Sequence, residues 1–119
     1  MINNRILLID DDQSLLDALA SFLILEKFQV KTVVQSTLVR EIISKYHPDL
    51  IILDIDLGNA DGRSICDELK RTPEYQHLPI ILLTALSYDE ISAIDCMADA
   101  IIGKPFETSM LLFNIRALL

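Results

Sequence analysis

Residues 5–12 read Arg-Ile-Leu-Leu-Ile-Asp-Asp-Asp, a short apolar run that ends abruptly in three acids. A solid apolar run of this length suits a strand that is buried on both faces of a sheet. Three later segments repeat the pattern of an apolar run followed by a polar residue. They are Leu50–Leu53 before Asp54, Ile80–Leu83 before Thr84, and residues 100–103 before Lys104. Because ligands of a parallel α/β sheet bind outside the carboxyl ends of its strands, these polar side chains are predicted to meet.

Helix-like segments separate the strand-like segments along the whole chain. Ser14–Lys27 carries apolar residues at helical spacing, and Gln29–Val34 is a further strand-like segment rich in β-branched residues. The other predicted helices are Thr37–Lys45, Asp61 to about Arg71, Asp89–Met97 and Glu107–Leu119. This alternation predicts an α/β fold in which a parallel five-stranded sheet has right-handed crossovers and helices on both faces.

Two of these helices carry apolar stripes that predict their buried faces. Leu38, Ile42 and Ile43 form the stripe of the second helix. In the last helix, the predicted core-facing residues are Leu111, Leu112, Ile115 and Leu118. A second apolar set follows at helical spacing, made of Met110, Phe113 and Ala117. That set either packs against a neighbouring helix or forms an exposed patch for a second copy or an output partner.

Composition narrows the class of protein. With 119 residues, the chain is expected to form one domain over residues 1–119, with no output domain visible. Eighteen acids against ten bases give a net charge of -8, which disfavours direct nucleic-acid binding. Neither a signal peptide nor an apolar run of ~18 residues is present, so we expect a cytoplasmic protein without a membrane partner. Cys66 and Cys96, placed in helix-like segments without metal-site spacing, are interpreted as reduced thiols.

The predicted cluster of strand-end residues suits a divalent metal and a phosphoryl group. Mg²⁺, or Mn²⁺ as the alternative, prefers oxygen ligands, which Asp11 and Asp54 would supply directly and Asp10 through water. Asp54 would be a nucleophile, because carboxylates form acyl phosphates. Lys104 would add a point charge, and the Thr84 hydroxyl would donate to a phosphoryl oxygen. Taken singly, each residue has a structural explanation, such as helix capping by Asp12 or Asp11.

Taken together, these motifs resemble the receiver domains of two-component response regulators, over essentially the whole chain. The matching pieces are L-L-I-D-D-D at 7–12, P-D-L-I-I-L-D-I-D-L at 48–57, D-G at 61–62, L-P-I-I-L-L-T-A at 78–85 and K-P-F at 104–106. The resemblance implies a flavodoxin-like (βα)5 three-layer sandwich with strand order 2-1-3-4-5. It implies that Asp54 accepts phosphate from a sensor histidine kinase, a histidine phosphotransfer protein or a small acyl phosphate. It also implies a metal ligand in the backbone carbonyl of Asp56 and a cis Lys104-Pro105 peptide.

Several positions depart from the family pattern. Gly58-Asn59 stands where Pro-Gly is usual, which predicts a more flexible loop with unchanged chemistry. The Asp56 carboxylate is expected to face the phosphoryl site, where it would tune the lifetime of the phosphate. Ile101 replaces the usual Tyr or Phe that turns as Thr84 moves, so the relay to the face formed by helix four, strand five and helix five is expected to be altered. The segment from Thr84 to Lys104 is also short, and Met97 replaces a usual Gly, so helix four is expected to be short or irregular.

Two other functions fit parts of the sequence. Residues 51–56 match the strand-D-x-D motif of haloacid-dehalogenase-type phosphatases, with Asp54 as nucleophile and Asp56 as general acid. That motif normally lies on the first strand, and it leaves Asp10 and Asp11 unexplained. The second alternative is a receiver-fold interaction module that does not switch, which Ile101 favours and the complete acidic set disfavours. The kinase, the pathway and the downstream target are not encoded in these patterns.

Overall fold

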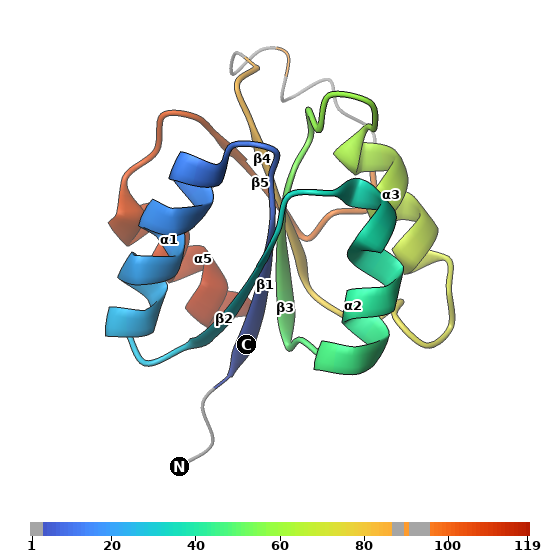
Figure 1. Cartoon of the computed structure of the whole chain (residues 1–119), viewed down its shortest axis with the longest axis horizontal. Coiled ribbons are helices and arrows are strands. Elements are labelled where there is room, and N and C mark those ends of the chain that lie inside the picture. Colours follow the sequence, from blue (N-terminus) through green and yellow to red (C-terminus); the bar gives the residue numbers. More distant parts are fainter. Residues whose placement is uncertain (1–3, 87–89, 91–95) are drawn as a thin grey trace.

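A five-stranded parallel sheet forms the centre of the protein, with strand order β2-β1-β3-β4-β5 (Figure 1). The computed structural model describes residues 4–86, 90 and 96–119. Its strands are β1 (Arg5–Ile9), β2 (Gln29–Val33), β3 (Leu50–Asp54), β4 (Ile80–Thr84) and β5 (Ala100–Gly103). Helices α1 (Gln13–Leu25) and α5 (Thr108–Leu118) cover one face, and α2 (Val39–Tyr46) and α3 (Gly62–Lys70) cover the other (Figure 1). The predicted three-layer α/β fold and its strand order are confirmed.

The core consists of two apolar clusters, one on each face of the sheet. Successive side chains of a strand point to opposite faces, so each buried strand serves both clusters. Leu7 and Leu53 belong to the cluster on the α2 and α3 side, whereas Leu8 and Ile52 belong to the cluster on the α1 and α5 side. All five residues of β3 are buried. The short apolar runs therefore predicted the central strands correctly because both faces of those strands are covered.

Helix boundaries differ from the predictions for local reasons. Asp12 caps α1, since its side chain accepts a hydrogen bond from the Leu15 N–H at 3.2 Å, as one of the two capping alternatives predicted. The helix ends at Leu25, before the predicted Lys27, because Lys27 has a left-handed backbone with φ 75°. The second helix opens with a 3₁₀ turn, η1 (Ser36–Leu38), that leaves Leu38 exposed. Placing Leu38 in the apolar stripe was therefore wrong, and Val39 is buried there instead.

At the carboxyl ends of the strands, the regular structure runs further than predicted. Asp54 and Thr84 are the last residues of β3 and β4, not the residues after them. The predicted helix Asp89–Met97 lies almost wholly outside the described residues. Residues 96–98 are described and are not helical, so the helical placement of Cys96 was wrong. Among the described residues, no helix is both long and apolar enough to cross a bilayer.

An ion pair with a buried lysine side chain joins α3 to the edge of the sheet where β4 and β5 begin. The side chain of Lys70 is 8% exposed, and its Nζ lies 2.7 Å from Asp99 Oδ2 and 2.8 Å from the Leu78 carbonyl oxygen. Asp99 Oδ2 also accepts a hydrogen bond from the Ile80 N–H at 2.8 Å. One carboxylate therefore satisfies a buried ammonium and a strand N–H together, and fixes α3 against the sheet.

Asp99→Ala is expected to lower the free energy of unfolding by about 2–4 kcal/mol, because it leaves the buried Lys70 ammonium without its counter-charge. Urea unfolding followed by circular dichroism measures this change. Glu41→Ala is the matched control, since it breaks the exposed pair between Glu41 and Lys45, and it should change stability little. Equal effects of the two variants would contradict the structural role given to Asp99.

Candidate functional site

Three carboxylates meet where β1 and β3 end. Asp10 follows β1, Asp11 is its neighbour, and Asp54 closes the adjacent β3. One oxygen atom from each of the three lies within 4.8 Å of the other two. Asp10 and Asp54 are only 2% and 6% exposed, whereas Asp11 is open to solvent. The structure therefore brings together the three acids that the sequence singled out, with one side of the cluster accessible.

Lys104 reaches this cluster from the end of β5. Its Nζ lies 3.2 Å from Asp10 Oδ2 and 3.3 Å from Asp54 Oδ1, so one ammonium bridges the two buried acids. The Lys104 backbone N–H donates to the Thr84 carbonyl oxygen at 2.6 Å, and the Lys104-Pro105 peptide is cis as predicted. Thr84 is buried, and its hydroxyl accepts a hydrogen bond from the Leu86 N–H at 3.1 Å. Pairing between β4 and β5 thus positions both the hydroxyl and the ammonium.

The electrostatics of the cluster oppose the ionisation of Asp54. Burial, followed by the charge of Asp10, raises the pKa of Asp54 to about 6, although Lys104 acts in the opposite direction. Partial desolvation and the adjacent Asp10 also raise the pKa of Asp11. Burial by itself lowers the pKa of Lys104, but the attraction of Asp10 and Asp54 outweighs it and the net shift is upward. A cluster of acids held in this way is short of positive charge, since one lysine faces three carboxylates.

The donor set fits a hard divalent cation. Mg²⁺ prefers oxygen ligands and usually keeps several of its waters. Asp10, Asp11 and Asp54 offer only carboxylate oxygens, and the exposed side of Asp11 leaves room for solvent. No softer ligand belongs to this cluster among the described residues. A second cation would also relieve the mutual repulsion that raises the pKa of Asp54.

A close contact between Gly62 and the backbone at the end of β3 helps to place Asp54. Gly62 donates its N–H to the Ile55 carbonyl oxygen at 2.7 Å, and a Cβ on Gly62 would overlap with the carbonyl oxygen of Asp54. Only glycine allows this approach. Asp61-Gly62 was interpreted as the start of a helix and as a family motif, and Asp61 does cap α3. The contribution of Gly62 to placing Asp54 was missed, since it depends on a contact seven residues or more along the chain that no local pattern encodes.

The Asp56 side chain has a backbone partner in the loop after β3. Its Oδ1 accepts a hydrogen bond from the Gly58 N–H at 3.1 Å, which ties the carboxylate to its own loop, where Gly58 has φ 78°. A charge on Asp56 still contributes weakly to the raised pKa of Asp11. Asp56 is therefore close enough to act on Asp11, and its orientation toward a phosphoryl group stays a prediction. Effects of Asp56 on phosphate lifetime, and metal binding by its carbonyl, stay predictions.

The residues singled out for signal output lie on β5 and α5. Ile101 pairs with Leu82 in the sheet and packs, half-buried, against the core on the α2 and α3 side. Of the two alternatives for the second apolar set of α5, exposure is correct. Met110 and Phe113 are 53% and 74% exposed, and Ala117 is exposed as well.

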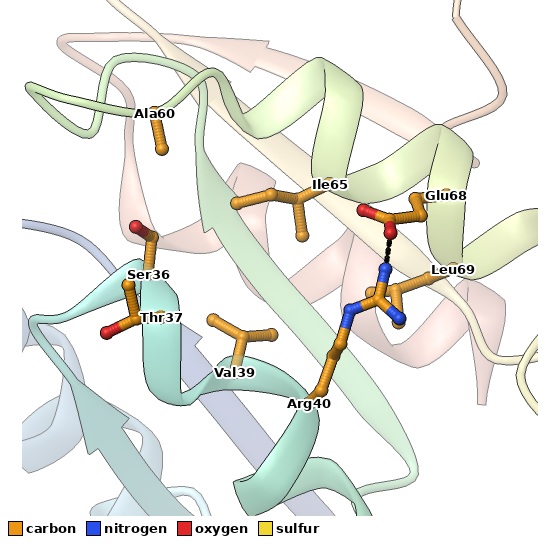
Figure 2. A pocket seen from close by; sticks show the side chains of 8 residues that line it. All are labelled: Ser36, Thr37, Val39, Arg40, Ala60, Ile65, Glu68 and Leu69. Carbon is orange, nitrogen blue, oxygen red and sulfur yellow. Dashed lines mark ion pairs between the residues drawn. The ribbon is translucent and has the colours of Figure 1, made fainter.

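A hollow of about 240 Å³ lies between η1, α2 and α3, away from the acidic cluster (Figure 2). Val39, Ile65 and Leu69 form much of its wall, and an ion pair between Arg40 and Glu68 crosses one end (Figure 2). None of the residues lining it belongs to the acidic cluster. The hollow is thus separate from the metal and phosphoryl chemistry that the sequence predicts.

Comparison with known proteins agrees with this geometry. RpaA of Synechocystis sp., a DNA-binding dual master transcriptional regulator, is 35% identical over 117 residues, which cover 97% of this chain and 48% of that protein. The receiver domain of RstA from Klebsiella pneumoniae is 30% identical with a TM-score of 0.85, covering 96% of this chain and 97% of that one. TrrA of Thermotoga maritima, solved in complex with Mg²⁺-BeF, is 27% identical with a TM-score of 0.86, covering 98% and 99%.

The chain spans about half the length, or less, of the first curated relatives that it matches. The haloacid-dehalogenase alternative is disfavoured, because Asp54 ends β3, whereas that motif normally lies on the first strand. A family model, described as the response regulator receiver domain, matches residues 6–116. The chain belongs to the response regulator receiver domain family.

Proposed function

We propose that this chain is a phosphoacceptor switch in which Asp54 receives a phosphoryl group with the help of Mg²⁺, or of Mn²⁺ in its place. The observation that carries the proposal is the convergence of Asp10, Asp11, Asp54 and Lys104 at the carboxyl ends of neighbouring strands. Metal and phosphoryl chemistry needs acids, a cation and a hydroxyl in one place. The related Thermotoga maritima protein, solved with Mg²⁺-BeF, supports the same assignment.

Each residue has a distinct role in the proposed reaction. A carboxylate oxygen of Asp54 attacks phosphorus, the bond from phosphorus to the donor nitrogen or oxygen breaks, and the donor leaves with that electron pair. A bound Mg²⁺, held by Asp11 and Asp54 and through water by Asp10, would neutralise charge on the transferring group. Lys104 adds a second positive charge at the acceptor, and Thr84 turns its hydroxyl from Leu86 toward a phosphoryl oxygen. The chain itself turns over no separate substrate.

The proposed donor is a phosphohistidine on a sensor histidine kinase or on a histidine phosphotransfer protein. We place the protein in the cytoplasm, with the 119 residues acting as one receiver unit. The exposed Met110 and Phe113 on α5 are available to a second copy or to an output partner. Direct contact with nucleic acid is disfavoured, since acids exceed bases by eight.

Incubation with Mg²⁺ and a small acyl-phosphate donor is expected to add one phosphoryl group to the protein, as measured by intact mass. Asp54→Ala should abolish the gain, because it removes the only proposed acceptor. Asp17→Ala is the matched control, since Asp17 is an exposed acid on α1 whose side chain accepts a hydrogen bond from Gln13. It should retain the full mass gain.

A wild-type protein that gains no mass from the acyl phosphate or from phosphorylated kinases would support the non-switching interaction module instead. Ile101 is the observation that keeps this second candidate open, because an aliphatic side chain cannot make the aromatic swing of the family. A gain of mass that persists in Asp54→Ala would contradict the assignment of the acceptor.

A further inference from the structure

We propose that Cys66 and Cys96 form a regulatory disulfide when the protein is exposed to a peroxide, and that this bond crosslinks α3 to the segment that enters β5. The two thiols are free in the structure described here. They are 30 positions apart along the chain and neither takes part in the phosphoryl site. Cys96 is oxidised first, and Cys66 then forms the disulfide with the oxidised Cys96.

Cys66 and Cys96 are brought near one another because the segment before β5 is bonded to α3. The Met97 N–H donates to Asp67 Oδ1 at 2.8 Å, so the residues that follow the two cysteines are in direct contact. Both thiols pack into the same apolar cluster on the α2 and α3 side of the sheet. The charge of Cys96 also acts on Cys66 electrostatically. A disulfide requires Cα atoms about 4.4–6.8 Å apart, which neighbours held by such a bond can meet with small adjustments.

Their surroundings give the two thiols different reactivity. Cys66 is fully buried, and burial raises the pKa of its thiol to about 12, so it stays protonated and out of reach of a soluble oxidant. Cys96 is half-exposed and interacts electrostatically with the guanidinium of Arg63, which is held by Asp61 at 2.8 Å. Reactive cysteines occur in partly exposed, electropositive surroundings of this kind.

The chemistry follows from this difference and balances with hydrogen peroxide as the oxidant. The Cys96 sulfur attacks one peroxide oxygen, the O–O bond breaks, and sulfenic acid and water form. The Cys66 sulfur then attacks the Cys96 sulfur and gives up its proton, and the hydroxyl leaves as a second water. Two thiols are oxidised by two electrons in total, and one peroxide is reduced to two waters.

The consequence rests on the proposed function. The crosslink would anchor the chain between Thr84, which is proposed to contact the phosphoryl group, and Ile101 on β5. Those two residues are the predicted relay between phosphorylation and the output face. An oxidised protein would then accept phosphate at Asp54 and yet transmit less of the change to β5.

The direct test uses no phosphate donor, so it stands apart from the proposed function. The full chain is treated with hydrogen peroxide, quenched, unfolded without reductant and alkylated, and its mass is measured. We expect the loss of two hydrogens, no alkylation, and a crosslinked peptide pair containing Cys66 and Cys96 that dithiothreitol separates. Cys66→Ala should instead accumulate oxygen on Cys96, whereas Cys96→Ala should leave Cys66 reduced and alkylatable.

Wild-type protein that keeps two alkylatable thiols, or gains oxygen on Cys96 without a crosslink, would overturn the disulfide. Its effect on signalling is read from amide exchange in β5, compared between phosphorylated and unphosphorylated protein in both redox states. We expect the phosphorylation-dependent difference to fall at least several-fold on oxidation. An unchanged difference would contradict the regulatory role. A reduced protein that takes up no phosphate would contradict only the proposed receiver activity.

Discussion

Asp54→Asn is expected to stabilise the metal-free protein at pH 7.5, by about 1–3 kcal/mol in free energy of unfolding. Burial and the charge of Asp10 raise the pKa of Asp54 from 3.8 to about 6 in the folded chain, so ionising Asp54 costs the folded state more than the unfolded state. Asparagine has nearly the same shape and no charge. Lys104 keeps its partner Asp10 in the variant, so no buried ammonium is left alone.

The pH dependence of this difference has a defined sign. Between pH 3.8 and about 6, the folded protein holds the Asp54 proton more tightly than the unfolded chain does. The contribution of Asp54 to stability is therefore greatest below pH 3.8 and is lost as the pH rises through about 6. The stability gap between Asp54→Asn and wild type should open across this window and stay constant above it. A gap of the same size at pH 4 and pH 7.5 would show that ionisation of Asp54 is not its cause.

Added Mg²⁺ should close or reverse the gap, because the ion needs the carboxylate that the variant lacks. An ion present at ~100 times its Kd stabilises the folded state by about 2.7 kcal/mol. Urea unfolding with and without Mg²⁺ measures both effects on the same samples. Asp17→Asn, an exposed acid on α1, is the control and should respond to Mg²⁺ as wild type does. If Mg²⁺ stabilised Asp54→Asn and the wild type equally, Asp54 would not be a metal ligand.

The acidic cluster could be predicted from sequence because strand order and strand ends suffice to place it. Asp10, Asp54, Thr84 and Lys104 each follow or end a buried apolar run, and parallel strands bring those ends to one edge. The apolar runs are recognisable because helices cover both faces of the sheet. The pattern of apolar runs and polar residues along the chain therefore predicts the site. The ionisation behaviour of Asp54 could not be predicted in this way, because it depends on burial that only the folded chain has.

Other features depended on contacts between distant residues, and patterns did not predict them. Lys70 and Asp99 lie far apart in the sequence, and nothing around either residue signals their buried pair. The hydrogen bond that the Asp56 carboxylate accepts from the Gly58 N–H was not predicted. The contact between Asp67 and Met97 was likewise missed, although it sets the two cysteines together. The helix predicted over Asp89–Met97 was wrong at Cys96, since residues 96–98 are not helical.

Gly62→Ala is expected to lower the free energy of unfolding by about 2–4 kcal/mol and to weaken Mg²⁺ binding with it. A Cβ on residue 62 would overlap with the Asp54 carbonyl oxygen, and it would lie 3.0 Å from the Asp54 carbonyl carbon and the Ile55 Cα. These are backbone atoms at the end of β3 and in the residue that follows it, and they cannot turn aside as a side chain does. Relief of the clash must therefore move the end of β3, or the start of α3, and Asp54 moves with it.

Gly58→Asn is the matched control because it changes a glycine of the same loop without a clash. Gly58 has a left-handed backbone that asparagine tolerates, and its Cβ would lie 3.7 Å from Asp11 Oδ2, an ordinary contact. We expect it to cost less than about 1 kcal/mol and to bind Mg²⁺ as wild type does. If Gly62→Ala were as stable as Gly58→Asn, the close approach of α3 to Asp54 would not be what positions the acceptor. A variant that lost stability yet bound Mg²⁺ normally would separate the packing of this loop from the placement of Asp54.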